Sequence, residues 1–351
     1  MNYRPYDRCL SLDEMKFRED AFWNNYHHSF YSLLPESLFK YRKPTEDAIK
    51  NFEDDNAWFS HPADFDDTVD SVIFNDLESE LEEFEKSPKR IIEKLSKSFV
   101  HAFASAQGID IDEKQIEEAL PLFNLDGSIN EPATRNYLAD KMPEDKIDEC
   151  VERLKINTSQ ENNNVILKSA KGFMMNFIDI NKKIRSETFV FSMAEDCDSQ
   201  AMWGLYADES KGFCIEYQFP KDTFLGQRMI LNLFPIYYGE KPLVSFFDVL
   251  VKGIYAKQKV NGISFEDYKD FFVSAYTKDK SYEFQNEWRI TFDKNMGGHL
   301  QKFPFVKSII LGERMTEENK NRLIEIARKK NIKIYQRQLN ATGSKVIKVE
   351  F

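Results

Sequence analysis

The pattern of apolar and polar residues divides the chain into three stretches. Near the start, two short runs at 37–42 and 56–60 have the alternation and aromatic content of strands. A helical pattern over 46–53 lies between them. From about 71 to 183 the apolar residues recur every three or four positions, which predicts helices. Strand-type runs return after residue 188.

This arrangement predicts an α+β fold with a small mixed or antiparallel sheet as its core, split by a large helical insertion. We assign residues 1–70 and 184–351 to the α+β core domain and residues 71–183 to a helical insertion subdomain. With 351 residues the chain is long enough for one large domain or two, and its 30 Phe and 15 Tyr residues can fill a sizeable core.

The most informative stretch is 189–217, with the sequence FVFSMAEDCDSQAMWGLYADESKGFCIEY. Its two β-prone ends enclose a short aromatic segment, so we expect a strand, a helix and a second strand. Trp203 and Tyr206 are three residues apart and would share one face of that helix. This arrangement favours a recess for a flat, partly apolar ligand. Alternatively, both side chains belong to the hydrophobic core, which is the more common role of aromatic residues at helical spacing.

Charge and hydropathy argue against several classes of function. The formal net charge is -11 and the pI is near 5.2, which disfavours broad contact with a nucleic-acid backbone. No apolar run approaches the ~20 residues of a membrane span, so no membrane contact is expected. The four cysteines form no CxxC pair and no signal peptide precedes them, which favours a cytoplasmic protein with reduced thiols.

A metal site is not expected. The five histidines show no ligand spacing. His61 together with Asp64, Asp66 and Asp67 would be able to bind a divalent ion, but a capped turn is the more common role of such a loop. The break at 124–132 superficially resembles a calcium loop, yet it lacks the alternating acidic ligands and the terminal glutamate.

The run NEWRI at 286–290 places two charged residues on one face of a predicted strand. Alternation directs Glu287 and Arg289 to one side and Trp288 to the other. Such a pair is often a solvated face, but the aromatic neighbours favour an interior position. A buried glutamate needs a partner, and Arg42 or Arg289 is the natural one. A buried Arg–Glu set is either structural or a site for a ligand with phosphates and hydroxyls.

Four segments combine into an ordered set of motifs. The chain has LFKYR at 38–42, FSHPADFDD at 59–67, MWGLYADESKGFCIEY at 202–217 and SYEFQNEWRI at 281–290. In this order they resemble a bacterial and phage family that is defined only as a domain of unknown function, DUF2971. The resemblance covers the α+β parts and leaves the helical insertion outside. Family members often carry histidines where this chain has Leu205, Ser210 and Lys211, so a mechanism that needs those imidazoles is not expected.

The order of elements also resembles the ADP-ribosyltransferases. Those proteins begin with a strand ending in H-Y-T or an Arg, continue with a helix and a short strand with an aromatic residue and a Ser, and carry a late glutamate on or next to a strand. The corresponding features here are Arg42, the helix at 46–53, Trp58-Phe59-Ser60 and Glu287. The resemblance implies NAD as a substrate and cleavage of its nicotinamide–ribose bond through an oxocarbenium-like centre.

The same resemblance implies roles for individual residues. Glu287 would stabilise the positive ribose and hold one of its hydroxyls, with Glu283 as a second carboxylate. Arg42 would bind the pyrophosphate as the third member of the catalytic set. The side chains expected to hold NAD are Lys40, Tyr41, Ser60, Ser192, Trp203, Tyr206 and Arg289. This prediction requires Arg42, Glu287 and Trp203 to surround one hollow.

We therefore predict an NAD-consuming enzyme that either transfers ADP-ribose to a protein or nucleic-acid acceptor or hydrolyses NAD. The resemblance implies a toxin or an effector in defence against phage. An alternative from a different class is a non-catalytic sensor module of a defence system that binds a nucleotide or a protein, and the missing histidines favour it. In a third hypothesis the helical insertion binds a protein partner and the α+β part is its scaffold.

Overall fold

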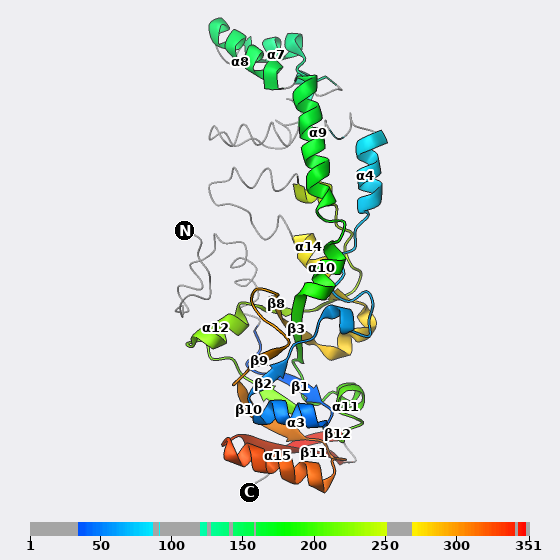
Figure 1. The fold of residues 1–351 in the computed structure, drawn as a ribbon, viewed down its shortest axis with the longest axis vertical. Coiled ribbons are helices and arrows are strands. Elements are labelled where there is room, and N and C mark those ends of the chain that lie inside the picture. The colour runs from blue at the N-terminus through cyan, green and yellow to red at the C-terminus, as the bar shows by residue number, and fades with distance from the viewer. Residues whose placement is uncertain are drawn as a thin grey trace.

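The computed structural model describes most of the α+β core and part of the helical region. The described residues are 34–86, 91, 120–124, 128–139, 143–157, 159–250, 269–340 and 343–348. Residues 1–33, assigned above to the core domain, and most of 87–119, assigned to the helical subdomain, lie outside them. Figure 1 shows an elongated molecule with the sheet at one end and the helices α7 (Glu131–Ala139) and α8 (Glu144–Asn157) at the other.

An eight-stranded mixed sheet forms the body of the molecule and confirms the predicted α+β class. Its strand order is β12-β11-β10-β4-β1-β3-β8-β5, and only β10 and β11 run parallel. The strands are β1 (Leu38–Arg42), β3 (Thr188–Ala194), β4 (Phe213–Tyr217), β5 (Leu233–Pro235), β8 (Glu287–Asp293), β10 (Val306–Leu311), β11 (Lys333–Asn340) and β12 (Gly343–Lys348).

Two short ribbons flank this sheet. In the first, β2 (Asn56–Trp58) pairs antiparallel with β9 (Leu300–Lys302), and in the second, β6 (Tyr237–Tyr238) pairs parallel with β7 (Thr277–Lys278). The β7 strand leads into the 3-10 helix η4 (Lys280–Gln285), which ends where β8 begins. This short path brings β7, η4 and the start of β8 together.

Helices occupy the chain between β2 and β3, and most of them extend away from the sheet (Figure 1). The helices between these strands are α4 (Leu77–Lys86), α7, α8, α9 (Gln160–Met175) and α10 (Ile180–Glu187), with the 3-10 turns η1 (Pro62–Asp64) and η2 (Leu120–Leu122). The others are α3 (Glu46–Glu53), α11 (Gln200–Tyr206), α12 (Phe224–Ile230), α14 (Lys269–Ala275) and α15 (Glu317–Lys329). The domain boundaries at 70 and 184 stay a prediction. Within the described residues, no helix has both the length and the apolar character that a membrane span requires.

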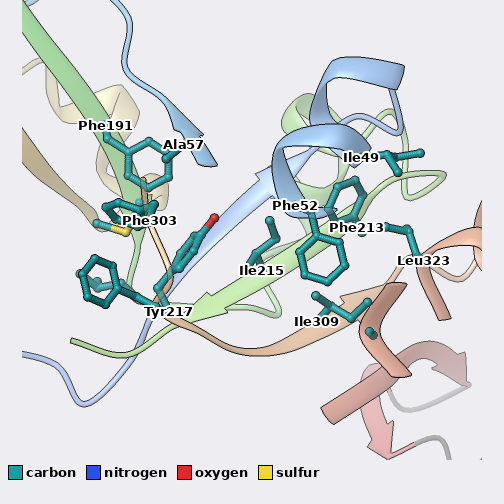
Figure 2. Packing of buried hydrophobic residues seen from close by; sticks show 14 of the residues in the cluster. Ile49, Phe52, Ala57, Phe191, Phe213, Ile215, Tyr217, Phe303, Ile309 and Leu323 are labelled. Carbon is teal, nitrogen blue, oxygen red and sulfur yellow. The ribbon is translucent and has the colours of Figure 1, made fainter. Parts of the chain in front are cut away.

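The two faces of the sheet carry different clusters. On the face covered by α3 and α15, called the α3 face here, a large apolar cluster includes Phe52, Phe191 and Ile290. Figure 2 shows part of this packing, with Ile49 and Phe52 of α3 lying over Phe213. The opposite face, called the α11 face, holds a smaller cluster of Tyr41, Ala194, Trp203, Ala207, Cys214 and Ile310.

Cross-strand pairing fixes the face to which each side chain belongs. Residues directly opposite in neighbouring strands point to the same side of a sheet. Phe191 pairs with Ile290, and both belong to the α3 face. Ala194 pairs with Glu287 on β8 and with Phe39 on β1, and these residues belong to the α11 face. Since successive residues of a strand alternate, this register assigns every position on β1, β3 and β8.

Candidate functional site

Four charged side chains form a buried network on the α11 face. The Arg289 guanidinium donates from both terminal nitrogens to Asp70, over 2.6 Å to Oδ1 and 2.7 Å to Oδ2. Its Nε donates to Glu287 Oε1 over 2.7 Å. Lys278 Nζ lies 2.5 Å from Glu287 Oε2 and 3.4 Å from Asp70 Oδ2. All four residues are at most 8% exposed, and their charges sum to zero, which makes the network compatible with burial.

Three segments supply these side chains: β8, the nearby β7, and a loop more than 200 residues earlier in the chain. Glu287 and Arg289 alternate along β8 and therefore share one face, as the sequence predicts. Lys278 ends β7, and the chain returns to β8 through Asn286, which adopts a left-handed conformation with φ of 38°. Asp70 lies in the loop after η1, next to Ser71, whose hydroxyl donates to Asp70 over 3.0 Å. The network thus joins this loop to the sheet.

The electrostatics of the network hold its carboxylates in the ionised state. Burial alone would raise the pKa of Glu287, but attraction to Arg289 and Lys278 outweighs burial and lowers the pKa to about 2. The same balance between burial and Arg289 keeps the pKa of Asp70 well below its usual value. Both oxygens of Glu287 accept hydrogen bonds from Arg289 or Lys278. Glu287 at neutral pH is therefore an ionised carboxylate and has no proton to donate.

A hydrogen-bond chain leads from the network to the surface. Lys278 Nζ donates to Gln285 Oε1 over 2.9 Å, and Gln285 Nε2 donates to the Tyr206 hydroxyl over 2.7 Å. Tyr206 is 42% exposed, and its neighbour Leu205 and the nearby Phe284 of η4 are exposed as well. Tyr206 is therefore the surface end of a chain that is otherwise buried.

Arg42 and Lys40 form no hydrogen bond or ion pair with this network, although, besides burial, the charges of Glu287, Lys278 and Arg289 act on the pKa of Lys40. They pair with Phe213 and Ile215 on β4, which places both cations on the α3 face, opposite to Glu287. Both lie over the ring of Phe191, with Lys40 Nζ 5.0 Å and Arg42 Cζ 5.7 Å from the ring centroid. The hollow that was expected between Arg42, Glu287 and Trp203 is not formed.

Trp203 is a core residue on the α11 face. It is 0% exposed, and its indole nitrogen donates to the carbonyl of Cys197 over 2.8 Å. Tyr41 packs edge-on against it at 5.3 Å between ring centroids, and the buried Arg337 guanidinium lies 5.3 Å from the centroid of the same ring. Tyr41 is buried too, and its hydroxyl donates to the Asp196 carbonyl over 2.8 Å. At 0% and 4% exposure, the rings of Trp203 and Tyr41 are part of the hydrophobic core.

The remaining predicted residues lie at separate positions. Ser60 forms a backbone bridge with Val190, and Ser192 pairs with Arg289 while its carbonyl accepts a 2.5 Å hydrogen bond from Lys40. Glu283 is an exposed residue of η4. Of the predicted set, the structure brings together Glu287, Arg289 and, through Gln285, Tyr206.

Several residues of the site escaped the sequence analysis. Asp70 is 219 positions from Arg289, and Lys278 lies in a two-residue strand with no clear pattern. The only available signal was the requirement that an interior Glu287 needs cationic partners, which does not identify them. Arg337 was missed too, although it is completely buried, with both terminal nitrogens bonded, one of them to both oxygens of Glu313 at 2.9 and 3.0 Å.

Comparison with known families identifies the segment that holds much of this network. Residues 202–290 match the model of a family described as a protein of unknown function (DUF2971). The chain carries a DUF2971-like domain. The matched segment of the DUF2971-like domain contains Tyr206, Lys278, Gln285, Glu287 and Arg289, whereas Asp70 lies before it.

No curated protein and no solved structure matches the chain. The resemblance to ADP-ribosyltransferases therefore has no support from these comparisons. In the described part of the chain, no three histidine, cysteine, aspartate or glutamate side chains gather in a way that could hold a metal ion. The function has to be argued from the geometry of the site.

Proposed function

We propose that this chain is a non-catalytic binding module that recognises a nucleotide. The observation that carries the proposal is the state of Glu287, whose two oxygens are both engaged by Arg289 and Lys278. A carboxylate in this state is suited to fixing the loop around Asp70 and Ser71. Glu287 therefore has a structural role in the proposed binding module.

The geometry disfavours cleavage of NAD. To contact a ribose, Glu287 would have to release Arg289 or Lys278 inside the protein. An uncompensated buried charge costs about 3–5 kcal/mol, so this release is unfavourable unless the substrate replaces the lost contact. The cation assigned to the pyrophosphate, Arg42, lies beyond the sheet from Glu287. This separation argues against a joint action of the two groups on one nicotinamide–ribose bond.

A second feature supports recognition of an anionic ligand. Lys40 and Arg42 are half-buried, adjacent on one face, and have no ion pair with any described carboxylate. In a chain with a net charge of -11, two adjacent cations that form no ion pair with a described residue suit a negatively charged ligand. The proposed role as a sensor in defence against phage rests on the sequence resemblance alone, as does the proposed binding of a protein partner by the helical insertion.

Calorimetric titration of the full chain with NAD, ADP-ribose and ATP tests the proposal, with nicotinamide release measured in parallel. We expect saturable binding of at least one of these nucleotides and no nicotinamide above the level of a protein-free control. Glu287→Gln and Glu283→Gln are compared with the wild type. Glu283 is exposed and lies in η4, so it serves as the matched control for removal of one carboxylate.

Two results would reject the proposal. Release of nicotinamide by the wild type that is lost in Glu287→Gln and kept in Glu283→Gln would establish an NAD-consuming enzyme. Failure of all three nucleotides to bind would remove the nucleotide as the ligand.

A further inference from the structure

Two histidines from distant parts of the chain meet beside β3. His61 follows the bridge between Ser60 and Val190, and His299 comes directly before β9. Their ring centroids lie 4.6 Å apart, with an angle of 75° between the ring planes. Both side chains are partly buried. Sequence spacing gives no sign of this pair, because only the fold brings the two residues together.

Each ring has one nitrogen fixed by a backbone carbonyl. His61 Nδ1 lies 2.6 Å from the carbonyl oxygen of Thr188, and His299 Nδ1 lies 2.9 Å from that of Phe59. A carbonyl oxygen only accepts hydrogen bonds, so Nδ1 carries the proton and donates in both rings. In the neutral ring the other nitrogen, Nε2, then holds a lone pair.

The protein makes no use of the two Nε2 atoms. Neither of them forms a hydrogen bond or an ion pair with a described residue. Neither is enclosed as a buried atom without a partner. Both lone pairs are therefore accessible to a ligand from the solvent.

The backbone on both sides of the pair is held in place. Ser60 and Val190 exchange two hydrogen bonds, of 3.0 and 2.9 Å, directly before His61. The His299 carbonyl accepts from the Phe59 amide over 2.7 Å, while the His299 ring donates to the Phe59 carbonyl. The two histidines are thus attached to one continuous piece of backbone structure.

Aromatic side chains restrict the rotation of the two imidazoles. The ring of Phe189 lies 4.4 Å from that of His61 and 5.0 Å from that of His299, between centroids. Trp58 stacks on His299 at 4.7 Å, with 9° between the planes, and is 47% exposed. The pair therefore lies near the surface, in rings that lose little side-chain freedom when they bind a ligand.

These features are typical of imidazoles that bind metal. A metal-binding histidine almost always donates its second ring nitrogen to a backbone carbonyl, a carboxylate or water. With Zn–N distances of about 2.0–2.1 Å, two imidazoles on one tetrahedral ion have ring centroids about 5 Å apart. The observed separation of 4.6 Å is close to that value. Imidazole suits zinc, nickel and copper, whereas magnesium and calcium prefer oxygen ligands.

We infer that His61 and His299 bind one divalent transition metal ion of the zinc, nickel and copper group through their Nε2 atoms. No third histidine, cysteine, aspartate or glutamate side chain joins them within the described residues, so the protein supplies two ligands. A tetrahedral ion then keeps about two positions for water or for oxygen atoms of a ligand. Both histidines lie outside the segment 202–290 that matches DUF2971, and the inference does not depend on nucleotide recognition.

Calorimetric titration of the full chain with Zn²⁺, Ni²⁺ and Mg²⁺, after treatment with a chelator, tests the site. We expect saturable binding of Zn²⁺ and Ni²⁺ and no binding of Mg²⁺ at the pair. His61→Asn and His299→Asn keep an amide donor near the position of Nδ1 and lose Nε2. Each should weaken Zn²⁺ binding by more than the roughly 10- to 100-fold that loss of an outer-shell partner costs.

His61→Phe and His299→Phe are the second pair of variants, because they keep the ring packing and remove both nitrogens. They should lose Zn²⁺ binding as the Asn variants do. The control variants are His101→Asn and the double change of His27→Asn with His28→Asn, three histidines outside the described residues. We expect both controls to bind Zn²⁺ at the pair with the wild-type affinity.

Nitrogen NMR of the imidazoles in the wild type gives a test that needs no variant. Without metal, His61 and His299 should show the tautomer with the proton on Nδ1, and Zn²⁺ should shift the Nε2 signals of both rings. A Zn²⁺ titration that shifts neither ring, or only one of them, would overturn the inference. So would equal Zn²⁺ affinity of the wild type and the variants of the pair, or loss of affinity in the variants of one histidine alone.

Discussion

Arg42 and Glu287 lie on opposite faces of the same β-sheet. Arg42 pairs with Phe213 in the cluster under α3, while Glu287 pairs with Ala194 in the cluster beside α11. Two groups separated by a sheet have no common contact with one small ligand. The sheet thus separates a sealed charge network around Glu287 from Lys40 and Arg42, which form no ion pair with a described residue.

The sealed network should contribute strongly to stability. Asp70→Asn removes one charge and leaves Arg289 with an incomplete set of partners in a buried position. We expect the free energy of unfolding to fall by about 3–5 kcal/mol, the usual cost of breaking one side of a buried ion pair. Urea unfolding followed by circular dichroism measures this change.

An exposed ion pair of α4 provides the control for that measurement. Glu82 and Lys86 form an ion pair one helical turn apart, with both side chains more than 60% exposed. Glu82→Gln should cost at most about 1 kcal/mol because solvent screens the pair. Equal effects of Asp70→Asn and Glu82→Gln would contradict the structural role that we assign to the network.

The same network should set the acid stability of the protein. The pKa of Glu287 is about 2 in the folded chain, below the value of about 4.3 expected when it is unfolded. A lowered pKa means that the unfolded state takes up the proton first, so this carboxylate stabilises the fold above about pH 4.3. That contribution is lost as the pH falls through about 2, and Asp70 acts in the same direction.

Glu287→Gln should therefore flatten the dependence of unfolding free energy on pH between about 4.3 and 2, although it lowers stability at neutral pH. Urea unfolding at four pH values in that window measures the slope. Glu283→Gln removes an exposed carboxylate of the neighbouring η4 and should keep the wild-type slope. A wild-type slope in Glu287→Gln would show that the ion pairs of Glu287 do not form in solution.

Alternation along a strand made part of this site predictable. It placed Glu287 and Arg289 on one face of β8, and the structure joins them over 2.7 Å. The same rule, applied to the observed strand, puts Lys40 and Arg42 on one side of β1. Which face each pair occupies depends on the register between β1, β3, β4 and β8, strands that are far apart in the chain. A one-residue shift of register reverses the face, so local pattern alone had no means of deciding it.

The aromatic helix shows a similar limit. Trp203 and Tyr206 do share roughly one side of α11, but Trp203 is 0% and Tyr206 is 42% exposed. The helix has only seven residues, so Trp203 near its middle is buried while Tyr206 at its last position reaches the solvent. The sequence pattern predicted the helix correctly. It did not show that Trp203, and not Tyr206, is the residue that packs against Tyr41 and Arg337.

Replacing Gly212 or Gly204 by alanine should change the stability of the protein in opposite directions. A methyl group on Gly212 would lie 2.1 Å from the carbonyl oxygen of Arg42, a distance that requires the backbone to move. Around Gly204, inside α11, the corresponding position has no atom within 4 Å. Gly212→Ala should therefore lower the melting temperature or prevent folding, since overpacking typically costs about 1–3 kcal/mol or more.

Gly204→Ala should raise the free energy of unfolding by up to about 1 kcal/mol, because alanine is the better helix former. Thermal unfolding of the two variants beside the wild type tests the pair. A Gly212→Ala variant as stable as Gly204→Ala would mean that the end of β1 does not approach the start of β4 as closely as described.

Lys40 on the α3 face should make the stability of the protein depend on pH between about 7 and 10. The pKa of Lys40 is lowered to about 7 in the folded chain, chiefly by burial and then by Arg42, against about 10.4 when unfolded. Between these values the unfolded state binds the extra proton, so raising the pH relieves a cost and stabilises the fold. The wild type should therefore gain stability relative to Lys40→Met from about pH 7 to 10.

Urea unfolding of both proteins at pH 7, 8 and 9 measures that difference, and Lys43→Met, which removes an exposed cation, should follow the wild type. A difference between wild type and Lys40→Met that stays constant with pH would show that the half-buried position of Lys40 does not lower its pKa in solution.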